Sequence, residues 1–303
     1  MNENLNDITF IIVSYNSERT LRGAIASCLM SLKDSYQGRG KVVVYDNAST
    51  DSSPKILDEY NQEYPNLFIG IKGKENLGFA KGNNKAVEAS PSKNYVLINP
   101  DVTFKSVVIT KLQETLESAK DIAVVCPKLL FLDNSVQPSI RRFPTFLYLF
   151  FKLFLGEKLQ NRLYPFDYYY AQLPEAVTTI EVNWAIGAFM MVSGEYVRLY
   201  GLFDERFFLY FEDVSLCLEA WQNNYRVLFD PSVSAMHLYP RKSTSSGFNR
   251  LTLIHMISAL KFFGKHRKYP QKTNTEPVRY QQNSKVTLVG QSICAESRKE
   301  LKK

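Results

Sequence analysis

Cysteine and histidine are scarce in this chain of 303 residues, which contains four cysteines and three histidines. The cysteines are far apart and form no C-x-x-C pair, which argues against a disulfide framework and against a zinc knuckle. A reducing, cytosolic setting fits this usage best. Residues 1–7 contain no basic residue ahead of an apolar segment, so we expect no secretory signal.

Apolar runs long enough to cross a bilayer are also absent. The longest, residues 146–155, has ten residues and is interrupted by Lys152, and we favour the protein core over a membrane interface for it. A second apolar segment, residues 251–263, has helical spacing at four positions: Leu253, Ile257, Leu260 and Phe263. A helix lying on a membrane surface and a helix packed on its own domain both fit this second pattern.

Acidic residues are few at the carboxyl end. The chain has 37 Lys and Arg against 30 Asp and Glu, and residues 261–303 hold 11 of the basic residues but only three of the acidic ones. A content of 45% hydrophobic and 22% charged residues is that of a globular protein and excludes collagen-like and wholly disordered chains. Because the positive charge follows the folded part instead of covering one face of it, we expect no nucleic-acid partner. An anionic membrane surface is the partner that this basic tail predicts.

The first part of the chain alternates between strand and helix patterns. Strands are predicted at residues 8–13, 41–45, 67–72 and 95–98, and helices at residues 19–32, 53–61 and 80–90. Such an alternation predicts a mostly parallel sheet. The carboxyl ends of parallel strands meet at one edge of a sheet, so the polar loops after these strands should line one cleft.

Three polar residues stand where the first two predicted strands end. Asp46 closes the second strand, and an ionised carboxylate there can accept hydrogen bonds from a base N–H or a ribose hydroxyl. Asp46 also begins the sequence DNAS, which is rich in turn-forming residues. Ser14 and Asn16 follow the first strand, where they can contact a nucleotide or cap the next helix.

Two glycines, Gly78 and Gly82, bracket Lys81 in a segment that enters the helix predicted at residues 80–90. Glycine lets the backbone approach a ligand closely, and a helix N-terminus with a lysine favours an anionic group. A dinucleotide-binding dehydrogenase would instead have G-x-G-x-x-G directly after the first strand, where this chain has SYNS. That class of enzyme is therefore disfavoured.

Beyond residue 101 the strict alternation ends. We expect helices at residues 106–120, 195–199 and 212–223, and strands at residues 123–127 and 227–236. An aromatic loop at residues 201–211 would deliver Glu212 and Asp213 to the start of a helix, where acidic residues also suit the helix dipole. His237 follows the last strand, where it can bind a metal ion or a diphosphate or have no role in function.

Six segments occur in the order that is typical of one enzyme family. They are VSYNS (13–17), VVYDNASTD (43–51), NLGFAKGNN (76–84), LINPD (97–101), AIGAFMMV (185–192) and GLFDERFFLYFEDVSLC (201–217). In this order they resemble the family 2 glycosyltransferases, and most closely the rhamnosyltransferase-like branch. The resemblance covers about residues 8–245, with His237 and Ser243 similar to the element that closes the site.

The resemblance implies an α/β fold of the GT-A type, with a Rossmann-like nucleotide-binding half and a mostly parallel central sheet. It also assigns a role to particular residues. The donor nucleotide would be bound by Ser14, Asn16, Asp46, Asn47, Gly78, Lys81, Asn83 and Asn99. A divalent cation, Mg²⁺ or Mn²⁺, would be held by Asp101 and His237. Asp213 would be the catalytic base. The sugar or the acceptor would be contacted by Trp184, Gly187, Glu212 and Arg141.

The chain departs from the family pattern at two positions. Asn99 stands at the first acidic position of the D-x-D metal element, so only one charged ligand, Asp101, is supplied there. Ser215 stands where the family usually has a further aspartate, which implies an altered contact with the acceptor.

We expect residues 1–105 to form the nucleotide-sugar half, residues 106–245 the acceptor half of the same domain, and residues 246–303 an amphipathic helix followed by a basic, partly disordered tail. The expected activity is inverting transfer of a sugar, rhamnose from dTDP-rhamnose, to a saccharide or lipid-linked saccharide in cell-surface polysaccharide synthesis. This would occur in the cytoplasm, at the inner face of the membrane. A non-catalytic sugar-nucleotide or glycan-binding module, a nucleotidyltransferase and a membrane-associated scaffold are the alternatives.

Overall fold

The structure, a computed structural model, describes residues 5–145, 178–238 and 250–266. The apolar segment at residues 146–155 and the basic tail lie outside the described residues. Within the described residues, no helix is both long enough and apolar enough to span a membrane.

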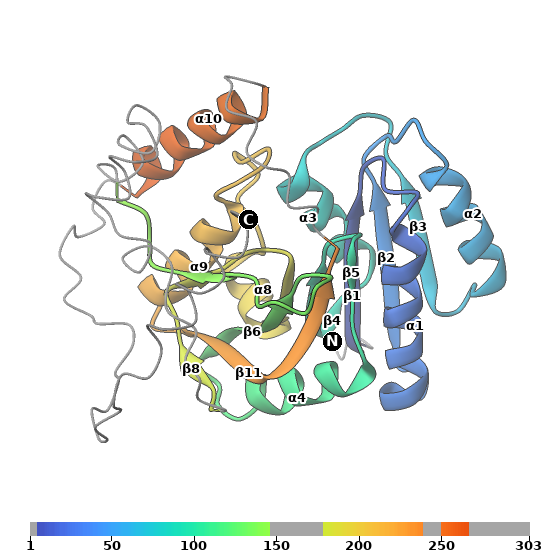
Figure 1. Cartoon of the computed structure of the whole chain (residues 1–303), viewed down its shortest axis with the longest axis horizontal. Helices are drawn as coiled ribbons and strands as arrows, with labels where there is room; N and C mark the ends of the chain where they lie inside the picture. Colours follow the sequence, from blue (N-terminus) through green and yellow to red (C-terminus); the bar gives the residue numbers. More distant parts are fainter. Residues whose placement is uncertain (1–4, 146–177, 239–249, 267–303) are drawn as a thin grey trace, which may run out of the picture.

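The first half of the chain forms the alternating elements that its pattern predicts. In chain order they are β1 (Asn6–Ser14), α1 (Leu21–Tyr36), β2 (Gly40–Asp46), α2 (Ser53–Glu63), β3 (Phe68–Lys72), α3 (Phe79–Ala89) and β4 (Ser92–Ile98). The four strands are parallel and lie side by side in the order β3, β2, β1, β4. Their carboxyl ends therefore share one edge of the sheet, the upper edge in Figure 1.

The second half extends the same sheet. Its elements are β5 (Val102–Thr103), α4 (Ser106–Leu116), β6 (Ile122–Leu130), β7 (Ile140–Arg141), β8 (Ile180–Glu181), β9 (Trp184–Ala185), β10 (Phe189–Ser193), α8 (Gly194–Tyr200), α9 (Glu212–Gln222), β11 (Arg226–His237) and α10 (Arg250–Lys265). The strand next to β4 is β10, and it is followed by β6, β11 and β5, with β8 on β11. A separate ribbon pairs β7 with β9.

The sheet is mostly parallel, as predicted, with one central exception. β10 runs antiparallel to both of its neighbours, β4 and β6. This strand comes late in the sequence and enters between two parallel strands, and no local pattern predicted that position. Its insertion places residues 186–188, which precede β10, beside the carboxyl end of β4.

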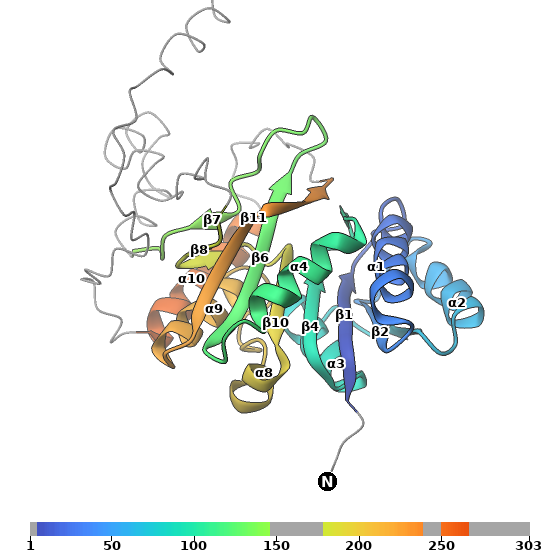
Figure 2. The same ribbon diagram turned by 90° about the horizontal axis from the view of Figure 1, so that it is seen from below.

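Apolar side chains cover both faces of the sheet. Along β2, Val44 faces the core formed with α1, α2 and α4, whereas Val43 faces the core formed with α3, α8, α9 and α10. This alternation along a strand follows from the period of two residues. Figure 2, which views the molecule from below, separates α1, α2 and α4 from the remaining helices. The two halves thus share one continuous sheet.

Candidate active site

The candidate site begins where β1 and β2 end side by side. Ser14 and Asp46, the last residues of these strands, are opposite one another in the parallel register. The Ser14 side chain is fully buried, and within the described part of the chain its Oγ has no hydrogen-bond partner. A buried hydroxyl without a partner is costly, and Ser14 lies at the edge of the sheet where ligands of such folds bind.

The loops after β1 and β2 are joined by hydrogen bonds. Asn16, whose backbone has a positive φ of 50°, accepts a bond from Thr50 N at 2.8 Å through Oδ1, and its own N–H donates to Ser49 Oγ at 2.8 Å. Asparagine tolerates this left-handed conformation better than most residues. Asn16 therefore links the loop after β1 to the loop after β2.

Asp46 is buried and anchors the turn that follows it. Its Oδ2 accepts from Ser49 N at 2.9 Å and its Oδ1 accepts from Ser49 Oγ at 2.5 Å. This is the turn-forming role that the sequence DNAS predicts. Each carboxylate oxygen has a second lone pair, so the turn leaves Asp46 able to accept from a nucleotide.

Asn47 ties the loop after β2 to the start of α3. Its amide accepts from Leu77 N at 3.1 Å and donates to Gly78 O at 3.0 Å. Asn47 therefore positions this loop.

The close packing of two chain segments requires a glycine at position 78. Its φ is +85°, and a Cβ at this position would lie 2.3 Å from Phe208 O, a backbone atom of the acceptor-side loop. The adjacent N–H of Phe79 donates to the same carbonyl at 2.7 Å. The sequence pattern suggested that this glycine admits a ligand, whereas the structure shows that it admits the neighbouring chain segment.

Two polar side chains of α3 have different surroundings. Asn83 is buried and donates to Phe79 O at 2.8 Å, one turn earlier. Lys81 lies in the first turn, is half-buried, and has no ion-pair or hydrogen-bond partner among residues 5–145, 178–238 and 250–266. The first turn of α3 contains no acidic residue. A lysine at a helix N-terminus without a neighbouring acid favours a bound anion.

Asp101 and His237 come together from distant parts of the sequence. His237 Nε2 lies 3.3 Å from Asp101 Oδ1, and Leu238 N donates to Asp101 O at 2.8 Å. His237 is buried, and its Nδ1 is 2.8 Å from Gln137 Oε1. Gln137 and Asp101 thus contact the two ring nitrogens of His237 from opposite sides and fix the orientation of the ring.

The donor set at this pair suits a divalent cation. Imidazole nitrogen and carboxylate oxygen are ligands of Mn²⁺, and Mg²⁺ is usually held by one or two carboxylates plus substrate phosphates. Across the described ranges no group of three or more His, Cys, Asp or Glu side chains gathers, so a diphosphate would have to complete the coordination. Sequence reasoning missed Gln137, because no motif marks a residue that orients a histidine from 100 positions away.

A second part of the candidate site is built on the β7–β9 ribbon. The guanidinium of Arg141 lies 5.3 Å from the centre of the Trp184 ring, and Trp184 Nε1 donates to Arg142 O at 2.8 Å. Trp184 is buried, whereas Arg141 is half-buried. Arg141 is also close enough to Asp213 for its charge to lower the pKa of that carboxyl.

Asp213 lies in the first turn of α9, held by two backbone donors. Its Oδ2 accepts from Gly187 N at 2.9 Å and its Oδ1 accepts from Val214 N at 2.8 Å. Burial raises the pKa of Asp213 above its ordinary value, although these hydrogen bonds and Arg141 act in the opposite direction. A carboxylate with a raised pKa is a better proton acceptor, which is what a general base needs.

Glu212 is buried beside Asp213. Its Oε2 has no hydrogen-bond partner within the described part of the chain. Burial, and secondly the neighbouring Asp213 charge, raises the pKa of Glu212 well above its usual range. The charge of Asp213 therefore disfavours ionisation of its neighbour Glu212.

Gly187 lies between the start of α9 and the start of α3. A Cβ on Gly187 would meet Asp213 Cβ at 3.4 Å and Phe79 Cε1 at 3.6 Å. The next residue, Ala188, accepts from Asn99 N at 2.9 Å. The structure therefore brings together the strand end at Asn99, the start of α3 and the start of α9, which are far apart in the sequence.

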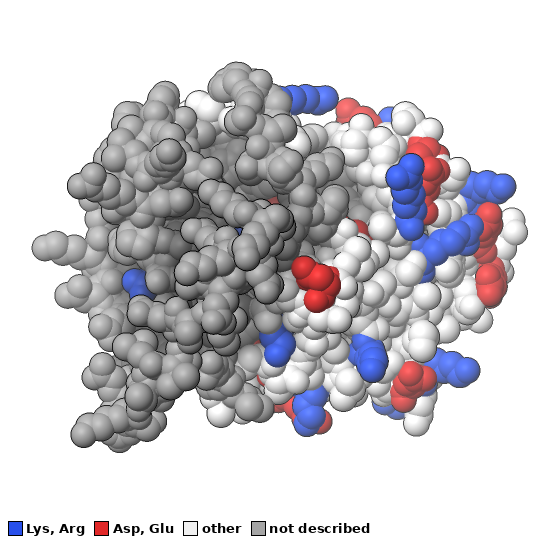
Figure 3. All heavy atoms as spheres, in the orientation of Figure 1, with Lys and Arg blue, Asp and Glu red and all other residues white. Residues whose placement is uncertain are grey.

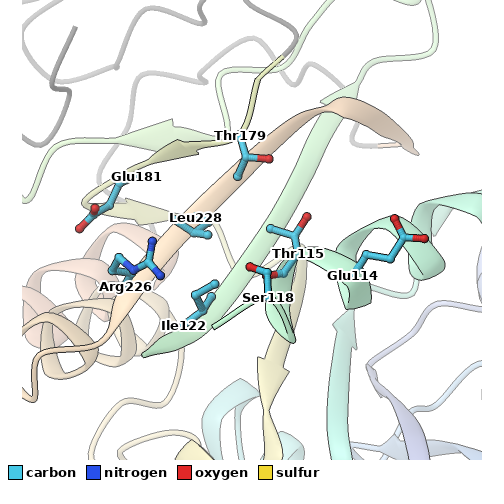
Figure 4. A pocket seen from close by; sticks show the side chains of 8 residues that line it. All are labelled: Glu114, Thr115, Ser118, Ile122, Thr179, Glu181, Arg226 and Leu228. Carbon is cyan, nitrogen blue, oxygen red and sulfur yellow. The ribbon is translucent and has the colours of Figure 1, made fainter. Parts of the chain in front are cut away.

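One surface hollow lies away from these residues. It has a volume of about 510 Å³ and is lined by Glu114, Thr115, Ser118, Ile122, Thr179, Glu181, Arg226 and Leu228 (Figure 4). Ile122 and Arg226 begin β6 and β11, which run parallel to β4. The hollow is therefore at the amino end of these strands, opposite the edge that carries Asp46 and Asp101.

Comparisons with known proteins agree with the motif order. The family model described as "Glycosyl transferase family 2" matches residues 9–185. Rhamnosyltransferase WbbL of Escherichia coli K12 is 26% identical over 272 residues, which cover 86% of this chain and 94% of that protein. The N-acetylglucosaminyl-diphospho-decaprenol L-rhamnosyltransferase of Mycobacterium tuberculosis H37Rv is also 26% identical, over 72% of each chain.

The fold also has relatives among solved structures. A crystal structure of GalNAc-T7 with UDP, GalNAc and Mn²⁺ superposes with a TM-score of 0.64 at 15% sequence identity. The match covers 88% of this chain and 50% of that one, so this chain spans half the length of that enzyme. At this identity the likeness establishes the fold.

Proposed function

Because the chain belongs to glycosyl transferase family 2 and is a glycosyltransferase with the GT-A fold, we propose that it transfers rhamnose from dTDP-rhamnose to a saccharide carried on a lipid diphosphate, with inversion at the anomeric carbon. The observation that carries this proposal is the position of Asp213. Its carboxylate is fixed by Gly187 N and Val214 N at the junction of the donor and acceptor sides. The rhamnose donor is supported by the names of the two rhamnosyltransferase relatives.

The proposed chemistry is a single displacement. An acceptor hydroxyl gives its proton to Asp213, and the hydroxyl oxygen forms a bond to C1 of the sugar from the face opposite the leaving group. The bond between C1 and the diphosphate oxygen breaks, and the nucleoside diphosphate leaves with the electron pair. Each step uses groups of the chain and the two substrates alone.

The donor side would bind the nucleotide through the edge of the sheet. Asp46 and Ser14 would accept from or donate to the base and ribose, while Asn16 and Asn47 keep their loops in place. Lys81 and the N-terminus of α3 would lie near the diphosphate, where the lysine charge and the helix dipole stabilise negative charge. Asn83 and Gly78 would contribute by keeping the first turns of α3 in position.

A divalent cation fits the Asp101 and His237 pair. When bound, Mg²⁺ or Mn²⁺ would neutralise charge on the departing diphosphate. Gln137 would hold the His237 ring so that Nε2 stays on the same side as Asp101. Asn99 would add an amide oxygen or a contact to the donor, in place of a second charged ligand.

The acceptor would lie between α9 and the β7–β9 ribbon. Trp184 offers an apolar ring at a sugar, and Arg141 offers a cation to an acceptor phosphate. A lipid-linked acceptor would place the enzyme in the cytoplasm at the inner face of the membrane, in the synthesis of a cell-surface polysaccharide. A non-catalytic binding module and a nucleotidyltransferase are not favoured by the family.

Release of nucleoside diphosphate from dTDP-rhamnose, with UDP-glucose and GDP-mannose as competing donors, tests the proposal. The purified chain is incubated with Mg²⁺ or Mn²⁺ and a synthetic N-acetylglucosaminyl-diphospho-lipid. We expect acceptor-dependent release of dTDP, and a new glycosidic bond whose anomeric configuration is inverted. Release from another sugar nucleotide alone would refute the donor and keep the enzyme class, whereas release from none of them would refute the proposed activity.

A further inference from the structure

Helix α10 has one face packed against the acceptor loop, residues 203–211. Ser258 Oγ donates to Leu209 O at 2.8 Å, and Lys261 Nζ donates to Arg206 O at 2.7 Å. Phe262 is fully buried and lies 5.3 Å from the Phe211 ring, measured between ring centroids. The acceptor loop leads directly into α9 and its catalytic carboxylate, so α10 supports the acceptor side from outside.

Further contacts hold the end of α10 to the same part of the molecule. Lys265 forms ion pairs with Asp204, at 2.7 Å, and with Glu219 of α9. His266 Nε2 lies 3.2 Å from Ser215 Oγ. These contacts fix which side of α10 faces the protein, and therefore which side faces outward.

The outward face of α10 is apolar. Leu253 is 45% exposed, Ile257 43% and Leu260 64%, and Leu251 in the first turn is 52% exposed. Leu253, Ile257 and Leu260 are spaced as i, i+4 and i+7, so they form one stripe along the helix, called here the α10 stripe. Other large apolar side chains that are more than half exposed, such as Met30 and Leu199, lie on separate helices.

The charges near the α10 stripe are positive. Arg250 and Lys261 are exposed beside it. In the sequence, residues 241 and 242 are Arg and Lys, and residues 267–303 contain nine basic residues against three acidic ones. On the side of the molecule that carries α1 and α2, Figure 3 instead shows acidic and basic side chains interspersed. Positive charge is therefore concentrated in the sequence around α10.

An apolar stripe with cationic flanks fits an anionic lipid surface. The leucine and isoleucine side chains would enter the boundary between headgroups and acyl chains, and the basic residues would lie against anionic headgroups. A second copy of the chain would bring the same positive charges face to face, which opposes self-association through this face.

We propose that α10 docks the enzyme on an anionic bilayer through Leu253, Ile257 and Leu260, with the basic residues around it as electrostatic support. Figure 1 shows α10 at the same edge of the molecule as the carboxyl ends of β1 and β2. Docking through this helix would turn the acceptor side toward the membrane, where a lipid-linked acceptor lies. The benefit for a lipid-linked acceptor rests on the proposed function. The docking contact does not, because it depends only on the surface of α10.

Vesicle co-sedimentation of the full-length chain tests the proposal. Vesicles of phosphatidylcholine with and without phosphatidylglycerol are compared at low and high salt. The double variant Leu253→Glu with Leu260→Glu is compared with a control, Met30→Glu with Leu199→Glu. The control makes the same charge change at two exposed apolar residues elsewhere, 62% and 61% exposed. We expect the stripe variant to lose binding to anionic vesicles by about tenfold or more, and the control to bind like the unaltered chain.

Equal binding by the stripe variant, or no binding by the unaltered chain, would overturn the proposal. Sedimentation velocity adds a further outcome: a dimer that the stripe variant converts to a monomer would overturn it in favour of self-association. Binding of dTDP is measured by calorimetry on the same preparations. A stripe variant that loses vesicle binding but still binds dTDP tests docking separately from the proposed function. If the unaltered chain does not bind dTDP, the proposed donor is wrong, whatever the outcome for docking.

Discussion

Asp51 in the loop after β2 and Asp213 at the start of α9 are held alike and ionise differently. Asp51 accepts from Glu18 N at 3.0 Å and from Ser53 N at 2.9 Å, and Asp213 accepts from Gly187 N and Val214 N. Burial opposes ionisation at both, but at Asp51 the hydrogen bonds prevail and the pKa is lowered, whereas at Asp213 burial prevails and the pKa is raised. Asp51 therefore stays ionised as an anchor between two loops, whereas Asp213 takes up a proton more readily.

The largest difference should appear when each carboxylate becomes an amide. We expect Asp213→Asn to lower kcat by about a thousandfold or more, because an asparagine amide cannot take the proton from the acceptor hydroxyl. The affinity for the donor should be unchanged. The matched variant Asp51→Asn should leave kcat within a few-fold and lower thermal stability, since its carboxylate holds two loops together. Initial rates of dTDP release and dTDP calorimetry measure both. A large loss of kcat in both variants would mean that the two carboxylates do not differ as described.

Gly78 lies where the start of α3 packs against the loop at residues 203–211. A larger residue at this position should push these two segments apart. In Gly78→Ala the new Cβ would lie 2.3 Å from Phe208 O, so the acceptor loop would have to move. We expect a loss of stability of about 2–4 kcal/mol, from overpacking and the positive φ together. Gly201→Ala is the matched control, because Gly201 has a φ of +80° with no atom within 4 Å of the new Cβ. It should cost only about 1–2 kcal/mol in chemical denaturation, and an equal loss in both variants would show that backbone strain alone matters at Gly78.

Asp46 tests whether a donor-side anchor also binds the donor. We expect Asp46→Ala to weaken dTDP binding by about ten- to a hundredfold, which corresponds to the loss of one charge-assisted hydrogen bond. Ser49→Ala removes the hydroxyl that Asp46 binds in the turn and keeps the carboxylate. Calorimetry should show near-normal affinity in that control. If Ser49→Ala weakened binding as much as Asp46→Ala, the role of Asp46 would be confined to the turn.

The first half of the chain could be predicted from the sequence in more detail than the second half. Each donor-side element is a short periodic segment with its own turn, so Ser14, Asp46 and Asn99 were placed at the correct edge by the order of strands. The family and the fold were predicted correctly from six ordered motifs. The antiparallel insertion of β10 was not predicted, because it depends on pairing between residues about 90 positions apart. Contacts such as Phe208 O against Gly78, or Gln137 on His237, follow from that long-range packing and leave no local signal.

Of these substitutions, Glu212→Gln should have the smallest effect. It should change thermal stability only at high pH. Its pKa is raised in the folded chain by burial and by Asp213, so between the unfolded and folded pKa values the folded state binds more protons than the unfolded state. Stability is then lost as the pH rises through this window. Glu212→Gln keeps the shape and cannot ionise, so at pH about 8 its melting temperature should exceed that of the unaltered chain by a few degrees. At pH about 4 the two should coincide. Glu114→Gln, at a surface carboxylate paired with Lys111, is the control and should show no such divergence. A pH-independent difference for Glu212→Gln would mean that Glu212 ionises normally in the folded chain, and would remove the contrast between this carboxyl and its neighbour.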